Sequence, residues 1–108
     1  MAYDLNLAER IRSELDGMPF VEKKMFGGVG YLLNGNMACG VNKDNLIVRV
    51  DHEKHATLLK MPHAKPFDLT GKPMKGWLMV EPGGYETPEQ LAAWIKEGIG
   101  FALTLPPK

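Results

Sequence analysis

Cysteine is nearly absent from this chain, because Cys39 is the only one among 108 residues. A single thiol cannot form a disulfide within the chain, and such usage is typical of proteins kept in a reducing compartment. A surplus of one charge is also lacking, since 13 basic and 13 acidic residues give a formal net charge of zero. No global field therefore attracts nucleic acid or an anionic membrane. No apolar run approaches the roughly 20 residues of a membrane-spanning helix, and the N-terminus lacks the apolar segment of a signal peptide. We expect one cytoplasmic domain over residues 1–108.

Three helices are predicted from apolar spacing and from residues that start or stop helices. Asp51 is placed to cap a short helix at its N-terminus, and Pro62 lies beyond the end of that helix. Thr87 and Gln90 form a capping box with Pro88 at the first helical position, which marks the start of a longer helix. The predicted helices cover about residues 4–16, about 51–60, and 87 to the proline pair at 106–107.

Extended patterns predict the strands that lie between these helices. The first extended segment contains Gly27-Gly28, where we expect a bend. The order helix, three strands, helix, two strands, helix predicts an α+β fold, a two-layer sandwich of helices on one face of an antiparallel sheet of about five strands. The predicted strands cover about residues 22–33, 37–41, 46–50, 66–70 and 75–81.

Two-residue loops at Asn34-Gly35 and Lys43-Asp44 predict the register of the first three strands. In this register Gly28 and Gly30 lie on the helix-covered face, where a missing side chain lets a helix pack closely. The expected pairs are Leu32 with Met37, Gly30 with Cys39, Gly28 with Val41, Val41 with Leu46, Cys39 with Val48, and Met37 with Val50. The apolar residues expected on the buried face are Leu32, Met37, Cys39, Val41, Leu46, Val48 and Val50. We expect them to pack against Ile11, Leu15, Trp94 and Ile95 of the predicted helices.

The opposite face of the predicted sheet carries no helix, so its apolar side chains would be exposed. The register above places Val29, Tyr31, Ala38 and Ile47 on this face, with Arg49 beside them. A contiguous apolar strip on a protein surface indicates an interface. We expect these five residues to bind a partner protein or a second copy of the chain in a homodimer.

Residue types that perform catalysis or bind cofactors are present, but not in working patterns. The run Gly27-Gly28-Val29-Gly30 lacks the following helix and the Lys-Ser/Thr of a phosphate loop. His52 and His55 lie three residues apart with His63 nearby, yet a zinc site needs three or four ligands and no cysteine pairs with them. Cys39 falls on the predicted apolar face without the base that a catalytic thiol requires. We expect no enzymatic activity, no metal and no cofactor.

Basic residues outnumber acidic ones by seven to four between residues 43 and 75. This local excess is the basis of the alternative interpretation, a nucleic-acid-associated factor. No arginine cluster and no series of stacking aromatic residues accompanies the lysines, so we favour a protein partner. The basic residues concerned are Lys43, Arg49, Lys54, Lys60, Lys65, Lys72 and Lys75.

Three segments of the chain resemble the N-terminal domain of the TfoX/Sxy family of bacterial competence regulators. They are Met25-Phe26-Gly27-Gly28-Val29-Gly30-Tyr31, Asn34-Gly35-Asn36-Met37-Ala38 and Leu46-Ile47-Val48-Arg49-Val50-Asp51, although Ala38 stands where an aromatic residue is common. The residues that carry the family motif, and to which we assign a structural role, are Met25, Phe26, Gly27, Gly28, Gly30, Asn34 and Gly35.

The resemblance implies a fold similar to that of type III secretion chaperones, with the order α-β(3)-α-β(2)-α. It also implies regulation of transcription in natural competence, without catalytic residues. We expect a short, stand-alone member of the family. The sequence therefore predicts a non-enzymatic regulatory or interaction domain that acts through protein–protein contacts, with a nucleic-acid-associated transcription factor as the alternative.

Overall fold

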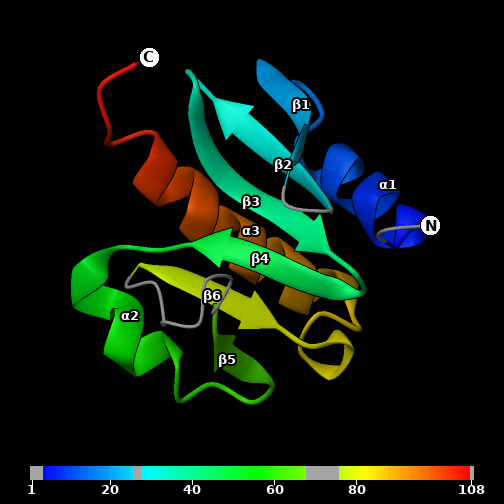
Figure 1. The fold of residues 1–108 in the computed structure, drawn as a ribbon, viewed down its shortest axis with the longest axis vertical. Helices are drawn as coiled ribbons and strands as arrows, with labels where there is room; N and C mark the ends of the chain where they lie inside the picture. The colour runs from blue at the N-terminus through cyan, green and yellow to red at the C-terminus, as the bar shows by residue number, and fades with distance from the viewer. Residues whose placement is uncertain (1–3, 26–27, 68–75, 108) are drawn as a thin grey trace.

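The computed structural model describes residues 4–25, 28–67 and 76–107. Three α-helices, six strands and one short 3-10 helix (η1) make up the described part of the chain (Figure 1). In chain order they are α1 (Leu5–Glu14), β1 (Phe20–Met25), β2 (Gly28–Leu33), β3 (Asn36–Asn42), β4 (Asn45–Arg49), α2 (His52–Leu58), β5 (Ala64–Pro66), β6 (Trp77–Val80), η1 (Pro82–Gly84) and α3 (Pro88–Ala102).

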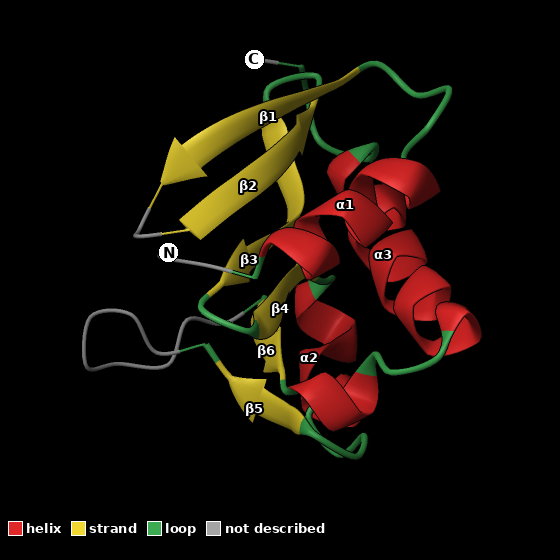
Figure 2. Cartoon of the chain, turned by 90° about the vertical axis from the view of Figure 1, so that its right-hand side faces the viewer, coloured by secondary structure: helices red, strands yellow, loops and turns green. Residues whose placement is uncertain are grey.

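The six strands form one antiparallel sheet in the order β1-β2-β3-β4-β6-β5. Figure 2 shows the strands on one side of the molecule and the helices on the other. The predicted two-layer α+β fold is confirmed, with six strands in place of about five. No helix within the described ranges has the length and apolar character needed to cross a membrane.

The sixth strand comes from the segment that was expected to be one bent strand over residues 22–33. It is a hairpin instead, because Met25 of β1 pairs with Gly28 of β2. Glycines in an extended segment are compatible with a bend and with a reversal of direction, and the chain reverses here. The strand predicted over 66–70 begins earlier, as β5 at Ala64–Pro66, and the one predicted over 75–81 is β6 at Trp77–Val80. Residues 68–75, on which parts of both predictions fall, lie outside the described ranges.

Both predicted two-residue hairpin loops are confirmed. Leu33 pairs with Asn36 across the first loop, where Asn34 and Gly35 have positive φ angles of 54° and 82°. Two successive positive φ angles define the type I′ turn that an Asn-Gly dipeptide favours. Asn42 pairs with Asn45 across the second loop.

A β-bulge between β2 and β3 makes part of the predicted register wrong. Leu32 pairs with Met37 as expected, but Tyr31 pairs with Cys39, so Ala38 is an extra residue on β3. One extra residue exchanges the two faces of the strand beyond it. Val29 therefore pairs with Val41, where Gly28 was expected, and Gly30 pairs with Gly40, where Cys39 was expected.

The bulge decides which side chains of β2 and β3 enter the core. Val29 and Tyr31 join the main core cluster, whereas Leu32 and Met37 are half-buried and do not belong to it. Beyond the bulge two predicted pairs of β3 with β4 are confirmed, Val41 with Leu46 and Cys39 with Val48, whereas the expected pair of Met37 with Val50 is not part of the ladder, because β4 ends at Arg49. The residues of the two confirmed pairs and Val50 share the core with helix residues predicted to face them, namely Ile11, Leu15, Trp94 and Ile95.

Helix α3 lies directly against the bulge. Thr87 caps it through the predicted capping box, in which the Gln90 backbone N–H donates to Thr87 Oγ1 at 3.1 Å and Thr87 N–H donates to Gln90 Oε1 at 3.0 Å. A Cβ on Gly98 would lie 2.2 Å from the backbone oxygen of Ala38. Only a glycine lets the helix axis approach β3 this closely, and the approach fixes α3 on the sheet.

Candidate functional site

Two residues of the predicted partner-binding strip, Val29 and Tyr31, are core residues. Tyr31 is fully buried, its hydroxyl donates to the backbone oxygen of Ala8 on α1 at 3.3 Å, and its ring lies 5.9 Å from that of Phe20. Burial raises the pKa of Tyr31. The assignment of these two residues to an exposed interface is wrong, because the bulge turns them towards the helices.

The other residues of the predicted strip are not exposed as a group either. Ala38 is fully buried in a small cluster with Leu33 and Ala102. Ile47 lies on the face away from the helices, yet only 2% of it is exposed. Arg49 is half-buried, with its guanidinium 5.2 Å from the ring centre of Trp77 and 5.5 Å from that of Phe101. Burial lowers the pKa of Arg49. The five residues therefore form no continuous surface strip.

Within the described part of the family motif, Gly28 and Gly30 do not lie on the helix-covered face as expected, because the bulge turns their neighbours Val29 and Tyr31 towards the helices. A Cβ on Gly28 would lie 1.9 Å from the backbone oxygen of Val41, so a neighbouring strand, and not a helix, requires this glycine. Gly30 pairs with Gly40 on the same face. Asn34 and Gly35 form the type I′ turn. Phe26 and Gly27 lie outside the described residues, as does the side chain of Met25.

The candidate nucleophile and metal ligands do not converge. Cys39 is completely buried, and its burial raises the pKa of the thiol to about 12, which leaves almost no thiolate at neutral pH. His52 and His63 are exposed, and a ring nitrogen of His55 lies 3.3 Å from the backbone oxygen of Trp77. Among the described residues no group of three His, Cys, Asp or Glu side chains could hold a metal ion.

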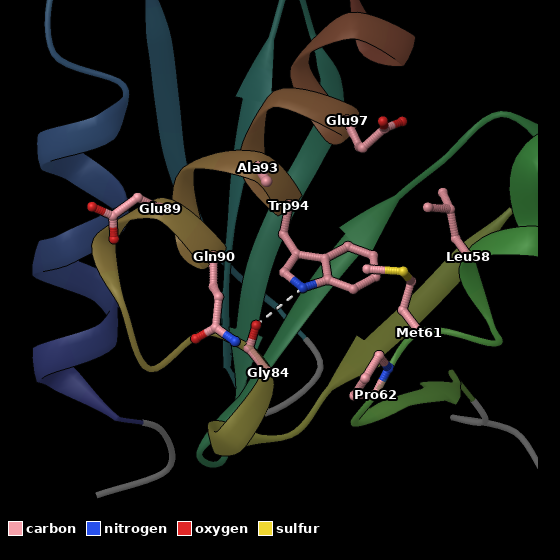
Figure 3. A pocket seen from close by; sticks show the side chains of 9 residues that line it. All are labelled: Leu58, Met61, Pro62, Gly84, Glu89, Gln90, Ala93, Trp94 and Glu97. Carbon is pink, nitrogen blue, oxygen red and sulfur yellow. Dashed lines mark hydrogen bonds between the residues drawn. The ribbon is translucent and has the colours of Figure 1, made fainter.

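A groove of about 490 Å³ runs between the end of α2 and the first half of α3 (Figure 3). Leu58 of α2, followed by Met61 and Pro62, forms one wall. Met61 is 49% exposed, so its apolar side chain lies partly open beside this groove. This volume matches the 300–1,000 Å³ that ligand-binding pockets commonly have.

Trp94 of α3 forms the base of the groove. Its indole Nε1–H donates to the backbone oxygen of Gly84 at 3.1 Å, as drawn in Figure 3. Because this donor is already paired, the indole offers its apolar surface to whatever enters the groove. Ala93, which is exposed and has a small side chain, keeps the centre of the groove open.

Carboxylates flank this apolar surface on the α3 side. Glu89 and Glu97 both line the groove, and Gln90 lies between them in the sequence. Glu97 Oε2 lies 3.6 Å from Lys54 Nζ of α2, in an ion pair whose side chains are 34% and 61% exposed. Exposed pairs of this kind contribute about 0–1 kcal/mol, so a competing cation can replace Lys54 at little cost.

The groove continues along α3 into a second hollow of about 560 Å³. Ala93 and Glu97 line both, and the second hollow extends to Gly100 and Phe101. The two hollows together form a valley between α2 and α3. The first hollow of this α2–α3 valley offers apolar contact and the carboxylates of Glu89 and Glu97, whereas the second is lined by charges of both signs, Asp51 and Glu97 with Lys54 and Lys96.

The sequence pattern did not indicate this valley. Trp94 was expected in the core, which the structure confirms, but its indole also lines the groove. The available signal was the segment at Leu58 and Met61, where apolar residues continue after a short helix without helical periodicity. Such residues have no predicted core partner and indicate a surface contact.

Comparison with known proteins identifies one family. The model of the TfoX N-terminal domain family matches residues 15–102, which is most of the chain and includes the strands, α2 and all of α3. No curated protein and no solved structure matches the chain. The family match agrees with the resemblance carried by the glycine motif.

Proposed function

We propose that this chain, which belongs to the TfoX N-terminal domain family, is a non-enzymatic regulatory domain that acts by binding another protein. The observation that supports this proposal is the α2–α3 valley, whose apolar base and exposed Met61 lie open at the surface. Family membership supports a role resembling that of competence regulators. The buried free thiol of Cys39 is compatible with the reducing cytoplasm, which we propose as the setting.

A protein partner is favoured over nucleic acid by the positions of the basic residues. Lys43 lies in the loop before β4 and Lys54 lies on α2 after it, so the length of β4 separates them (Figure 1). Lys54 faces Glu97, which reduces the attraction it offers to phosphate. Lys72 and Lys75 lie outside the described residues. Nucleic-acid binding by backbone contacts needs a continuous basic surface, and Lys43 and Lys54 lie at opposite ends of β4, not side by side.

A different protein is favoured over a second copy of the chain. The strip that was expected to mediate a homodimer includes the core residues Val29 and Tyr31. A homodimer through this strip would require the core to open, which is costly. The first hollow of the valley has Glu89 and Glu97 and no basic residue among its described lining residues, so two copies docked hollow to hollow would bring carboxylates together.

The test compares the wild-type chain with Ala93→Arg, which places a large cation in the centre of the valley. Ala93 is exposed on α3, so the variant is expected to fold normally. Val21→Arg is the matched control, because Val21 is 61% exposed on β1 and its replacement changes the charge equally. Proteins captured from the native cell by the wild type are identified, purified and measured by calorimetry.

We expect a partner that binds the wild type and Val21→Arg with equal affinity and Ala93→Arg at least tenfold more weakly. Thermal melting of all three chains confirms that they are folded. The proposal is wrong if no purified partner distinguishes Ala93→Arg from the control. Binding of DNA fragments that weakens steeply with salt, unchanged in Ala93→Arg, would favour the alternative function.

A further inference from the structure

We infer that the α2–α3 valley receives an amphipathic helix of the partner protein, with basic residues on both sides of one or two large apolar side chains. This inference rests on the proposed function and specifies the chemistry of the partner. Three features of the valley support it: its length, its apolar base and the position of its two carboxylates.

The length of the valley suits a short helix. Residues that line it extend along α3 from Gln90 to Phe101, which is roughly 16 Å along the helix axis. A partner helix of about three turns has the same length. The walls are side chains of α2, of the segment after it and of α3, and no strand edge lies between them. Extended peptides add to strand edges, whereas amphipathic helices lie in grooves between helices.

The apolar base suits large aliphatic or aromatic side chains. The first hollow, of about 490 Å³, is bounded by Trp94, Leu58 and Met61. Six of the nine residues that line this hollow are apolar or glycine. An apolar side chain that packs against them gains roughly 25 cal/mol for each Å² of apolar surface it buries.

The carboxylates set the charge of the partner helix and the spacing of its cations. Glu89 and Glu97 are eight residues apart on α3, or about 12 Å along its axis. Two basic residues at i and i+7 or i+8 of a helix that lies along α3 have the same separation, with the apolar side chains between them. The cation near Glu97 would replace Lys54, whose ion pair at 3.6 Å is exposed.

The two carboxylates of the first hollow disfavour the opposite arrangement. An acidic partner helix would place its carboxylates next to Glu89 and Glu97, and like charges in close contact reduce affinity. A neutral helix would gain the apolar contact alone. We therefore expect a basic partner helix to bind more tightly than a neutral one, and a neutral one more tightly than an acidic one. These differences in affinity should decrease as the salt concentration rises.

The experiment uses a displayed library of random peptides of about 15 residues, long enough for the three-turn helix. Peptides are selected on the wild-type chain and counter-selected on Ala93→Arg. The strongest binder is then synthesised in three forms, with its flanking positions occupied by Lys, Gln or Glu. Affinities are measured by fluorescence anisotropy at low and at high salt for the wild type, for the double variant Glu89→Gln/Glu97→Gln, and for the control Glu14→Gln on α1.

We expect enriched peptides to be helical with basic residues on both sides of apolar ones. The Lys form should bind the wild type at least tenfold more tightly than the Glu form, and the double variant should remove this difference while Glu14→Gln keeps it. The inference is overturned if enriched peptides are acidic, extended or absent, or if the double variant binds all three forms as the wild type does. It is also overturned if light scattering shows a dimer that only Ala93→Arg dissociates, because a second copy then fills the valley.

The two proposals can fail separately. A purified partner that requires Ala93, combined with peptides that show no preference for basic residues, leaves the proposed function intact and rejects the inference. Loss of both results rejects the proposed function as well.

Discussion

Helices α2 and α3 follow neighbouring strands of the same sheet but relate to it in opposite ways. Helix α3 buries five residues, Leu91, Trp94, Ile95, Gly98 and Ala102, and begins with a complete capping box. Helix α2 has seven residues and buries none of them. The comparison teaches that the longer helix holds the fold together, while the shorter one forms the outer wall of the α2–α3 valley.

The largest expected change in stability comes from replacing Gly98 of α3, and Gly100 of the same helix provides the control. Gly98→Ala would place a Cβ 2.2 Å from the backbone oxygen of Ala38, and backbone cannot yield as a side chain can. Helix α3 must then move away from β3, which we expect to cost about 3 kcal/mol of the free energy of unfolding.

Gly100→Ala is the matched control, because a Cβ at this position meets nothing within 4 Å. The same substitution should here stabilise the chain by about 0.5–1 kcal/mol, since alanine favours a helix more than glycine does. Urea denaturation of both variants measures the two effects. A Gly98→Ala variant as stable as the wild type would show that α3 is not fixed by its contact with the bulge.

A smaller difference in stability is expected between variants that remove the N-terminal caps of the two helices. Thr87→Ala removes the capping box of α3 and should lower the free energy of unfolding by about 1 kcal/mol. Asp51→Ala removes the acceptor for the Glu53 N–H at 2.9 Å, but α2 buries no residue, so it can fray without opening the core.

We therefore expect Asp51→Ala to change global stability by less than about 0.5 kcal/mol while it accelerates amide exchange within α2. Hydrogen exchange measured by mass spectrometry gives both values. Equal global losses for the two variants would contradict the difference between the helices.

The smallest effect concerns the ion pair that ties α1 to the edge of the sheet. Arg12 Nε lies 2.8 Å from Glu22 Oε2. Burial acts to raise the pKa of Glu22, but the hydrogen bond from Arg12 and the nearby positive charges outweigh it, so the pKa lies below 4.5. A lowered carboxyl pKa stabilises the fold above its unfolded value and loses that contribution as the pH falls through the folded pKa.

Glu22→Gln should therefore be less stable than the wild type by under about 1 kcal/mol at neutral pH, because the pair is partly exposed. The difference should decrease as the pH falls below 4.5. Thermal melts of both chains between neutral and acidic pH provide the measurement. A difference that grows in acid would show that Glu22 acts other than through its charge.

The sequence predicted those features that depend on local residues. Thr87 and Gln90 identified the start of α3, and Asn34-Gly35 identified the type I′ turn, because caps and tight turns depend on few residues. The pairing of Cys39 with Val48 followed from the second loop. In each case the deciding interaction lies within a few positions along the chain or directly across a hairpin.

The sequence did not predict the bulge at Ala38 or the α2–α3 valley, for related reasons. A bulge adds one residue without altering the apolar pattern, so alternation continued through Ala38 and assigned Val29 and Tyr31 to the wrong face. The valley depends on the distance between Trp94 and the segment around Met61, which are brought together only by the folded sheet. Local patterns carry no information about such a separation.

The rate at which the Cys39 thiol reacts with a labelling reagent reports how often the core opens. The only thiol of the chain lies beside the bulge, beneath α3, with no exposed surface. A thiol reagent can reach the Cys39 side chain only when the helices separate from the sheet. The labelling rate therefore measures how often this opening occurs, without any engineered probe. A partner helix bound in the valley would stabilise α3 against the sheet, so its binding would lower the labelling rate of Cys39.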